Sequence, residues 1–256
     1  MLETSPQPLK ENLPSYYESD DYISHTDSRR NLFEKVYHFV KSISLNRKLS
    51  LINSLATESK LLLDIGCGTG DFLQLAQKRG WDVLGIEPDI DARRIANNKT
   101  DNSVFDNDKL SSFDDNCFDV ITLWHVLEHV PNLEEQIALF HKLLKPNGTL
   151  IIAVPNFKSY DANYYGKFWA AYDVPRHLWH FSKKSIFTLM SNIEMKVIRI
   201  EPMKFDSFYV SLLSEKYQTG AMNPLRAFWV GFKSNLKAMS SGEYSSLIYI
   251  IKKCQK

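Results

Sequence analysis

Cysteine is scarce in this chain, and neither sign of charge is in excess. The three cysteines, Cys67, Cys117 and Cys254, are odd in number and form no CxxC pair. They argue against a disulfide framework or a structural zinc site, and for a reducing compartment. The 31 Lys and Arg residues and the 30 Asp and Glu residues leave a formal net charge of +1. Because this charge creates no overall attraction, we expect no nucleic acid partner.

Long apolar runs are absent as well. No stretch approaches the roughly 20 apolar residues that a membrane-spanning helix needs, so we expect no membrane span. The N-terminus, MLETSPQPLKENLP, is polar and contains proline, unlike a signal peptide. These absences favour a cytoplasmic protein. The 256 residues, 44% of them hydrophobic, suffice for one large buried core.

Residues 1–57 form a first unit without the strand pattern of the rest. Residues 1–27 have no helical period, which predicts a terminal arm that is mobile unless it packs against something. From Ser28, the predicted N-cap, apolar residues recur at helical spacing up to Ile43. A second helix is predicted from Asn46 to about Ala56.

Residues 58–202 alternate between short apolar runs and helical patterns. Apolar strands separated by helices predict an α/β fold, with a parallel sheet covered on both faces. The predicted strands are Lys60–Ile65, Trp81–Ile86, Ser103–Phe105, Phe118–Leu123, Thr149–Val154 and Met195–Ile200. The predicted helices are Phe72–Arg79, a segment from Pro88 to Asn97, Leu133–Leu144 and Lys183–Asn192. The turn signal Pro146-Asn147-Gly148 ends the third of these helices.

Two later segments complete the chain. Residues 156–182 have no clear period but are rich in aromatic residues. Residues 203–240 contain predicted helices around Ser207–Lys216 and Leu225–Met239, with aromatic residues at a spacing typical of a core. Ser246–Ile251 is the last predicted strand.

The strongest chemical signal is the segment Asp64-Ile65-Gly66-Cys67-Gly68-Thr69-Gly70, which follows a strand and precedes a helix. Glycines there allow a tight turn and let a ligand approach the main chain without Cβ clashes. The next helix offers free N–H groups at its N-terminus. A dinucleotide site would need a third glycine three residues after Gly68. That position holds Asp71, an anion, so a zwitterionic or cationic ligand fits better than a pyrophosphate.

Glu87 is the second signal. It ends the second predicted strand, about twenty residues after the glycines. From that position an acidic side chain accepts hydrogen bonds from ribose hydroxyls. A lone Glu at a strand end is usually only solvated, but the glycine turn upstream favours the ribose role.

Together these motifs resemble the class I methyltransferases that use S-adenosylmethionine (SAM). DIGCGTG resembles their glycine-rich motif, Glu87 their acidic residue, and FDVITLWHVLEHV and LKPNGTLIIAVPN their fourth and fifth strand regions. The resemblance covers about residues 60–155. AAYDVPRHLWHFS, from Ala170 to Ser182, further resembles an uncharacterised bacterial subgroup close in outline to the ubiquinone-biosynthesis O-methyltransferases.

The resemblance implies a Rossmann-like sheet of seven strands whose last two form an antiparallel hairpin. Helices would lie on both faces, and a helical N-terminal extension would precede the sheet. Residues 203–243 become a helical insertion or cap, and residues 244–256 the last strand and tail.

The resemblance also implies a site for SAM, whose demethylated product is S-adenosylhomocysteine. Gly66, Cys67, Gly68 and Gly70 should line its methionine part, and Asp64 should hold its amino group. Glu87 should bind the ribose and Pro88 should flank the adenosine. The further positions implied are Asp106 and Asn107 at the adenine edge, and Leu123, Trp124 and His125 beside the sulfonium.

Histidines are the candidate catalytic residues. Methyl transfer needs mainly alignment of donor and methyl acceptor, and a hydroxyl acceptor also benefits from a base. His125, His129 and His177 are the candidate bases. His125, Glu128 and His129 have i, i+3, i+4 spacing, which on a helical turn places all three side chains on one face. We expect no metal; the alternative is a divalent ion held by these three residues, with His177 as a fourth ligand.

The aromatic segment is the candidate pocket for the methyl acceptor. We expect Trp169, Tyr172, Arg176 and His177 to face a small-molecule acceptor. The alternative is a satellite hydrophobic cluster, with Arg176 salt-bridged to Asp173 or Glu201. The predicted function is methyl transfer from SAM to a small or medium-sized acceptor, most simply at oxygen. The alternatives are a nucleic-acid or protein methyltransferase and a non-catalytic SAM-binding scaffold.

Overall fold

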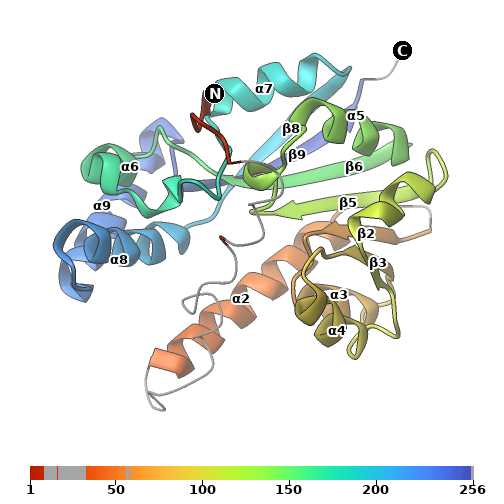
Figure 1. Ribbon diagram of the computed structural model, residues 1–256, viewed down its shortest axis with the longest axis horizontal. Helices are drawn as coiled ribbons and strands as arrows, with labels where there is room; N and C mark the ends of the chain where they lie inside the picture. The colour runs from red at the N-terminus through yellow and green to blue at the C-terminus, as the bar shows by residue number, and fades with distance from the viewer. Residues whose placement is uncertain (9–15, 17–32, 56, 58, 255–256) are drawn as a thin grey trace.

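The computed structural model describes residues 1–8, 16, 33–55, 57 and 59–254, with Phe33–His38 described by their backbone alone (Figure 1). The predicted N-cap Ser28 and most of the arm lie outside the described residues. In the described part of the chain, no helix is both long and apolar enough to cross a membrane.

The centre of the molecule is a seven-stranded sheet with the order β4-β3-β2-β5-β6-β9-β8. Only β9 runs against its neighbours, pairing antiparallel with both β6 and β8. This confirms the predicted sheet and its final hairpin. The strands are β2 (Leu61–Ile65), β3 (Asp82–Ile86), β4 (Val104–Phe105), β5 (Phe118–Trp124), β6 (Leu144–Pro155), β8 (Met195–Pro202) and β9 (Ser246–Lys253).

Helices cover both faces of this sheet (Figure 1). One face packs on α2 (Phe33–Asn53), α3 (Asp71–Gln77) and α4 (Ile90–Asn97), and the other on α5 (Leu133–Leu143) and α7 (Lys183–Ser191). Successive strand residues point to opposite faces. Thus Leu62 belongs to the first apolar cluster and Leu63 to the second, and both are fully buried.

The N-terminal region contains one long helix where two were predicted. α2 runs unbroken through Ile43–Asn46, a stretch without Pro or Gly to interrupt it. The side chain of Asn46 donates to the Ser42 carbonyl, 2.8 Å away, instead of capping a new helix. Leu49 and Ile52 then pack with Phe72 of α3, so tertiary contact holds the last turns in place.

The predicted turn at Pro146-Asn147-Gly148 is instead an irregularity within β6. α5 ends at Leu143 and β6 begins at once with Leu144. Phe118 pairs with Leu144 and Val120 pairs with Thr149. Between these two pairs the chain advances five residues along β6 but only two along β5. The turn-forming residues bulge out of the strand without ending it.

A helical layer lies at one end of the sheet, formed by α6 (Tyr160–Tyr165), α8 (Asp206–Thr219) and α9 (Pro224–Ser241) (Figure 1). α8 and α9 form the predicted insertion between β8 and β9. Ser207 and Gly231 let the two helices approach closely, since a Cβ on Gly231 would lie 2.9 Å from the Ser207 carbonyl oxygen. The aromatic spacing predicted a core here, but Phe228 and Trp229 are 52% and 63% exposed.

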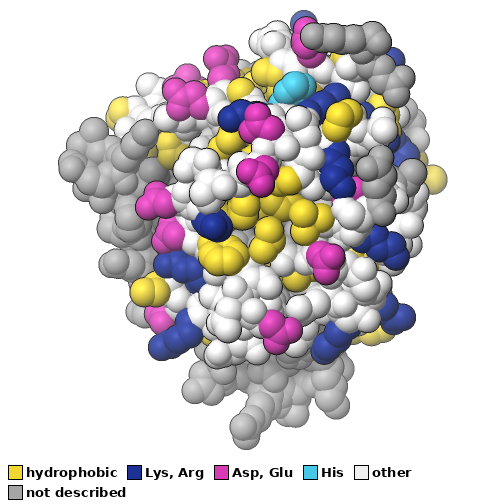
Figure 2. Space-filling model, turned by 90° about the vertical axis from the view of Figure 1, so that its right-hand side faces the viewer, with side chains coloured by type: hydrophobic (Ala, Val, Ile, Leu, Met, Phe, Trp, Pro, Cys, Tyr) yellow, Lys and Arg dark blue, Asp and Glu magenta, His cyan; other side chains and the backbone are white. Residues whose placement is uncertain are grey.

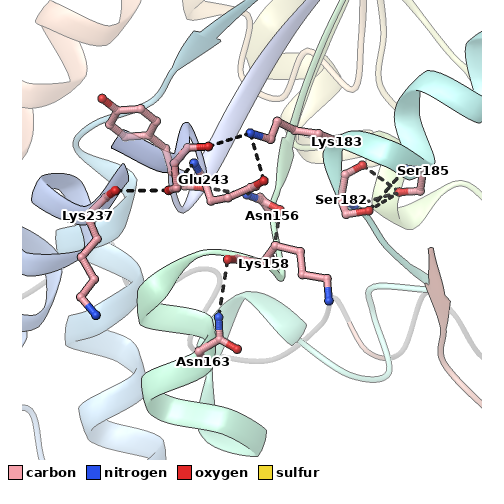
Figure 3. Close-up of polar contacts among 10 residues, drawn as sticks. Asn156, Lys158, Asn163, Ser182, Lys183, Ser185, Lys237 and Glu243 are labelled. Atoms are coloured by element: carbon pink, nitrogen blue, oxygen red, sulfur yellow. Dashed lines mark hydrogen bonds and ion pairs between the residues drawn. The ribbon is translucent and has the colours of Figure 1, made fainter. Parts of the chain in front are cut away.

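A polar network anchors the returning insertion to the sheet (Figure 3). Asn156, buried at the end of β6, donates to the Glu243 carboxylate over 2.7 Å. Lys183, at the start of α7, forms a 3.0 Å ion pair with the same carboxylate. Ser182 and Ser185 cap the start of α7 reciprocally. The contacts fix where α9 ends relative to β6 and α7.

The N-terminal tip contacts the aromatic segment. β1 (Leu2–Glu3) pairs antiparallel with β7 (Trp179–His180). Thr4 is buried beside them, and its hydroxyl donates to the His177 carbonyl over 2.7 Å. The first residues of the chain therefore cover the segment in which His177 and His180 lie.

Candidate active site

The glycine turn between β2 and α3 is tied to the end of the neighbouring strand. Gly66 and Gly68 have φ values of +65° and +55°, which favour glycine. The backbone N–H groups of Gly66 and Cys67 donate to the Ile86 carbonyl over 2.7 and 3.1 Å. Among the described residues, a Cβ on Gly68 would meet nothing within 4 Å. The described part of the chain therefore leaves space for a ligand above this turn.

Glu87 is held directly against this turn. Its carboxylate accepts from the Gly68 N–H over 2.8 Å and from the Asp89 N–H over 3.0 Å. The side chain is 8% exposed, and burial raises its pKa although the two N–H groups oppose the rise. Glu87 is thus the strand-end carboxylate that the sequence predicted, placed beside the glycines.

The segment after Glu87 is braced by Arg93. This guanidinium donates to the carbonyls of Glu87 and Pro88 and forms a 3.0 Å ion pair with Asp106. Asp106 also accepts from the Asn107 N–H over 2.6 Å. The two candidates for the adenine edge therefore lie next to the Glu87 loop, where Asp106 starts a short 3-10 helix, η4 (Asn107–Ser112).

Asp64 is buried at the carboxyl-terminal part of β2. The Thr122 hydroxyl of β5 donates to it over 2.5 Å. Burial raises its pKa to about 7, against the opposing effects of Thr122 and of Lys48. The Lys48 ammonium, from α2, lies 4.4 Å from the centre of the Trp124 ring. The sequence analysis did not identify Lys48 or Thr122. The one available signal was for Thr122, a polar residue within the apolar run FDVITL.

Cys67 and Leu123 are close in sequence to Asp64 and Thr122, at the carboxyl-terminal ends of β2 and β5. The Cys67 thiol packs toward Gly85, where an added Cβ would lie 2.8 Å from its sulfur. Leu123 is fully buried, whereas Trp124 is partly exposed and packs edge-on to Phe72 with centroids 5.8 Å apart. The Cys67 side chain thus points toward β3, and the Trp124 ring lies between Phe72 and the Lys48 ammonium.

Asp71 does not present a bare negative charge at the turn. It forms ion pairs of 2.6 Å with Lys41 and 2.7 Å with Lys99. Burial works to raise its pKa, but the two lysines lower it overall. The Asp71 charge therefore does not by itself exclude a pyrophosphate, whereas the lack of a glycine three residues after Gly68 still disfavours one.

His125 lies between two carboxylates. Its Nε2 is 3.1 Å from Asp206 of α8, and its Nδ1 is 3.4 Å from Glu128. Burial favours the neutral ring, but these carboxylates outweigh it and raise the His125 pKa to about 10. A ring that stays protonated at neutral pH does not accept a proton, so this environment argues against His125 as a base. Its contact with Asp206 joins β5 to the insertion.

His129 and His177 approach Glu128 from the other side. One ligand atom of each residue lies within 4.8 Å of the others, and the two rings pack edge-on with centroids 4.5 Å apart. Glu128 comes from the 3-10 turn η5 (Leu127–His129), and His177 from the loop before β7. The structure thus groups Glu128 and His129 with His177, whereas the predicted alternative set contained His125.

Burial and charge act differently on the members of this cluster. Burial lowers the pKa of His177 to about 4, so its ring is neutral. Burial works to raise the pKa of Glu128, but the protonated His125, 3.4 Å away, outweighs it and lowers that pKa to about 2, so Glu128 is ionised. The cluster therefore joins a buried carboxylate to an unprotonated imidazole.

The aromatic segment is divided between core and site. Trp169 is 2% exposed and donates to Asp161 over 2.8 Å, so it packs in the core instead of facing a pocket as predicted. Tyr172 lies edge-on between Trp169 and His180, 5.1 Å from each centroid. Arg176 forms a 2.7 Å ion pair with Asp173, which is the alternative that the sequence left open.

Charge is mixed on the face seen from the right-hand side of Figure 1. Figure 2 shows acidic and basic side chains scattered around a central apolar area, with no basic cluster among them. The described part of this face therefore has no excess of either charge.

A model of a methyltransferase domain family matches residues 32–200, about two thirds of the chain. The chain belongs to this methyltransferase family. The similarity extends over the glycine turn, Glu87, η5 and the aromatic segment. The match agrees with the resemblance found in the glycine motif and the strand regions.

Curated relatives point to the same enzyme class at low identity. The chain is 33% identical over 105 residues to the mitochondrial ubiquinone biosynthesis O-methyltransferase of Rattus norvegicus, covering 37% of this chain and 30% of the relative. It is 28% identical over 134 residues to the ubiquinone biosynthesis O-methyltransferase of Coxiella burnetii, covering 49% and 56%. The chain thus spans less than two thirds of the length of these relatives.

Solved methyltransferases share the fold over almost the whole chain. Geranyl diphosphate C-methyltransferase of Streptomyces coelicolor, solved with S-adenosylhomocysteine, matches with a TM-score of 0.62 at 15% identity, covering 98% of this chain and 100% of that one. A SAM-dependent methyltransferase of Archaeoglobus fulgidus matches with a TM-score of 0.59 at 19% identity, covering 91% and 100%. At these identities the likeness shows the fold alone.

SAM is the methyl donor of the Archaeoglobus fulgidus enzyme, and the present chain contains a methyltransferase domain of the family described above. Its own residues fit SAM: no described residue fills the space above Gly68, Glu87 presents a fixed carboxylate beside it, and Asp64 offers a buried carboxylate to an ammonium group. The carboxyl ends of β2 and β5, where the strand order reverses, are where open α/β sheets bind ligands.

Proposed function

We propose that this methyltransferase transfers the methyl group of SAM to an oxygen atom of a small or medium-sized acceptor. The observation that carries the proposal is the pairing of the buried Glu128 carboxylate with the unprotonated His177 ring just beyond β5. A hydroxyl must lose its proton as it attacks, and a buried carboxylate beside an unprotonated ring provides polar groups that can assist this loss.

The donor half would be served by the glycine turn and its two acidic neighbours. SAM, when bound, supplies a methyl group already activated by its sulfonium. Glu87 would accept hydrogen bonds from the ribose, and Asp64 would pair with the amino group. Gly66 and Gly68 would let the methionine part approach the backbone. These roles require only residues that the described structure already holds close together.

The methyl acceptor would enter from the side of β5 and the loop before β7. Tyr172 and Arg176 are partly exposed there, and Leu178 donates to the Glu128 carbonyl over 2.8 Å, which fixes the loop against η5. The contact between His125 and Asp206 holds α8 over the same side. Because alignment of the two reactants is the main task of the protein in methyl transfer, this fixed frame supports catalysis.

Relatives support oxygen as the target. The two curated relatives, from Rattus norvegicus and Coxiella burnetii, are named O-methyltransferases, and their similarity covers part of each chain. The near-neutral charge and the mixed surface of Figure 2 do not favour nucleic acid.

The test is a turnover assay with methyl-labelled SAM and matched panels of phenols, catechols, amines and carboxylates. We expect label transfer to hydroxyl-bearing acceptors. His177→Gln should lower kcat by about 10²-fold or more and leave SAM affinity unchanged. His141→Gln, on α5 and outside the cluster, is the control. Transfer to amines alone would contradict the proposal, and SAM binding without any transfer would favour a scaffold.

A further inference from the structure

Glu128 is a buried carboxylate without the hydrogen bonds that such a group needs. It is 1% exposed, and among the described residues neither of its side-chain oxygens has a hydrogen-bond partner. The protonated His125 forms an ion pair with one of these oxygens, but its Nδ1, 3.4 Å away, is too distant for a good hydrogen bond. Burying an ionised carboxylate is costly unless it is paired or coordinates a metal.

The two nearby imidazoles are oriented by backbone carbonyls. The Nδ1 atom of His177 lies 2.9 Å from the Ala171 carbonyl oxygen, and that of His129 lies 3.1 Å from the Arg176 carbonyl oxygen. A carbonyl oxygen only accepts, so each Nδ1 carries a proton, which leaves each Nε2 as the ring atom that could bind an ion. Histidines that ligate metals are commonly oriented in this way, with the other ring N–H donating to a carbonyl.

The distances suit a single ion. One ligand atom each from Glu128, His129 and His177 lie within 4.8 Å of one another. Metal–ligand bonds of roughly 2.0 to 2.2 Å place ligand atoms up to about 4.2 Å apart, so small side-chain adjustments suffice. His125 is not needed, because Asp206 pairs with its Nε2.

We propose that Glu128, His129 and His177 bind one divalent transition-metal ion. Two imidazoles and one carboxylate favour Zn²⁺, Mn²⁺ or Fe²⁺ over Mg²⁺. Three protein ligands leave a coordination position open, as in catalytic metal sites. The ion would satisfy the Glu128 oxygens that no hydrogen bond reaches.

The site has a consequence for the reaction that rests on the proposed function. An ion at this point would lower the pKa of an acceptor hydroxyl that contacts it, and the hydroxyl proton would leave to solvent. The oxygen would then form its bond to the methyl carbon while the bond between carbon and sulfur breaks toward sulfur. His177 would assist this proton loss as a ligand of the ion.

The experiment measures metal binding without turnover. Untagged protein is stripped with a chelator, and Zn²⁺, Mn²⁺, Co²⁺ and Mg²⁺ are titrated by calorimetry. We expect one ion per chain, with Mg²⁺ the weakest. Glu128→Gln and His177→Gln should each weaken Zn²⁺ binding at least about 10-fold, consistent with losses seen when supporting residues alone are removed. His125→Gln and His141→Gln should retain it.

Two further readouts guard against misleading results. The Co²⁺ complex should show visible bands for nitrogen and oxygen ligands and no thiolate charge-transfer band, which separates this site from the three cysteines. Bound Zn²⁺ should raise the Tm of the wild type but not of Glu128→Gln, whose folding is checked by circular dichroism.

Three outcomes would overturn the site: no stoichiometric ion in the wild type, equal losses in the His141→Gln control, or binding that depends on His125 instead of His177. Failure of the proposed function looks different. Stoichiometric metal binding with methyl transfer only to amines would retain the metal site and reject oxygen as the target.

Discussion

The donor half and the acceptor half of this site are built in different ways. In the donor half, Gly66, Gly68 and Glu87 come from two adjacent strand ends and are joined through backbone N–H groups. In the acceptor half, side chains from η5, the loop before β7, the N-terminal tip and α8 meet through side-chain and carbonyl contacts. A site made from backbone at adjacent strand ends leaves a short motif, and one assembled from distant side chains does not.

The two halves also differ in charge. In the donor half, burial raises the pKa of Asp64 and of Glu87, so these carboxylates gain from a positive ligand. In the acceptor half, the protonated His125 keeps the Glu128 carboxylate ionised despite its burial. Asp64 therefore becomes charged as its ligand arrives, whereas Glu128 is charged beforehand.

The largest expected effect comes from placing a methyl group in the donor turn. Gly68 and Gly220 both have positive φ, and neither would bring a Cβ within 4 Å of another described atom. Each alanine variant should therefore lose a similar 1 to 2 kcal/mol or so of stability through backbone strain. Only Gly68→Ala should also lose SAM affinity, by about 100-fold, because its Cβ enters the ligand space. Calorimetry and chemical denaturation separate the two effects, and equal SAM affinities in both variants would show that the turn does not contact SAM.

A smaller loss is expected when the strand-end carboxylate is made neutral. Glu87→Gln should weaken SAM binding about 10-fold, since a ribose hydroxyl gains more from a charged acceptor. Asp82→Asn, at the exposed opposite end of the same strand, is the matched control and should bind normally. SAM affinity is measured by calorimetry. If neither variant bound SAM more weakly than the wild type, Glu87 would not belong to the site.

The third prediction concerns pH. With its pKa raised to about 7, Asp64 is mostly protonated at pH 6 in the free protein. Its proton stabilises the folded state at low pH, and that contribution is lost as pH rises from about 4 toward 7. SAM favours the ionised form, so its affinity should rise about fivefold between pH 6 and pH 7.

Asp64→Asn supplies the control for this pH dependence. This variant should bind SAM more weakly at pH 7. It should also lose the rise in SAM affinity between pH 6 and pH 7 that the ionisation of Asp64 causes. Calorimetry of both proteins over this range makes the measurement. Identical pH profiles for the two proteins would contradict the role of Asp64.

The smallest effect is expected at Asp71, which starts α3 beside the turn but pairs with Lys41 and Lys99. Asp71→Asn should lower the free energy of unfolding by about 1 kcal/mol or less, because both pairs are partly exposed. SAM affinity should stay within about twofold. A large loss of SAM affinity in calorimetry would place Asp71 in the donor half after all.

Much of the fold was readable because buried parallel strands and helices have distinct apolar periods. The periods located the strands and gave the sheet its covered faces. They predicted a break between two helices where α2 is continuous, because packing on α3 overrides a weak local signal. They also placed a turn at Pro146-Asn147-Gly148, where pairing with β5 absorbs the extra residues as a bulge.

The candidate site shows the same division. The sequence alone determined the glycine turn and Glu87, because backbone conformation and strand-end position are local properties. Only the tertiary structure decided that Asp206 pairs with His125, that Trp169 is in the core, and that His177 joins Glu128 and His129. Those side chains come from separate segments, and their protonation depends on burial and neighbouring charges that no local pattern encodes.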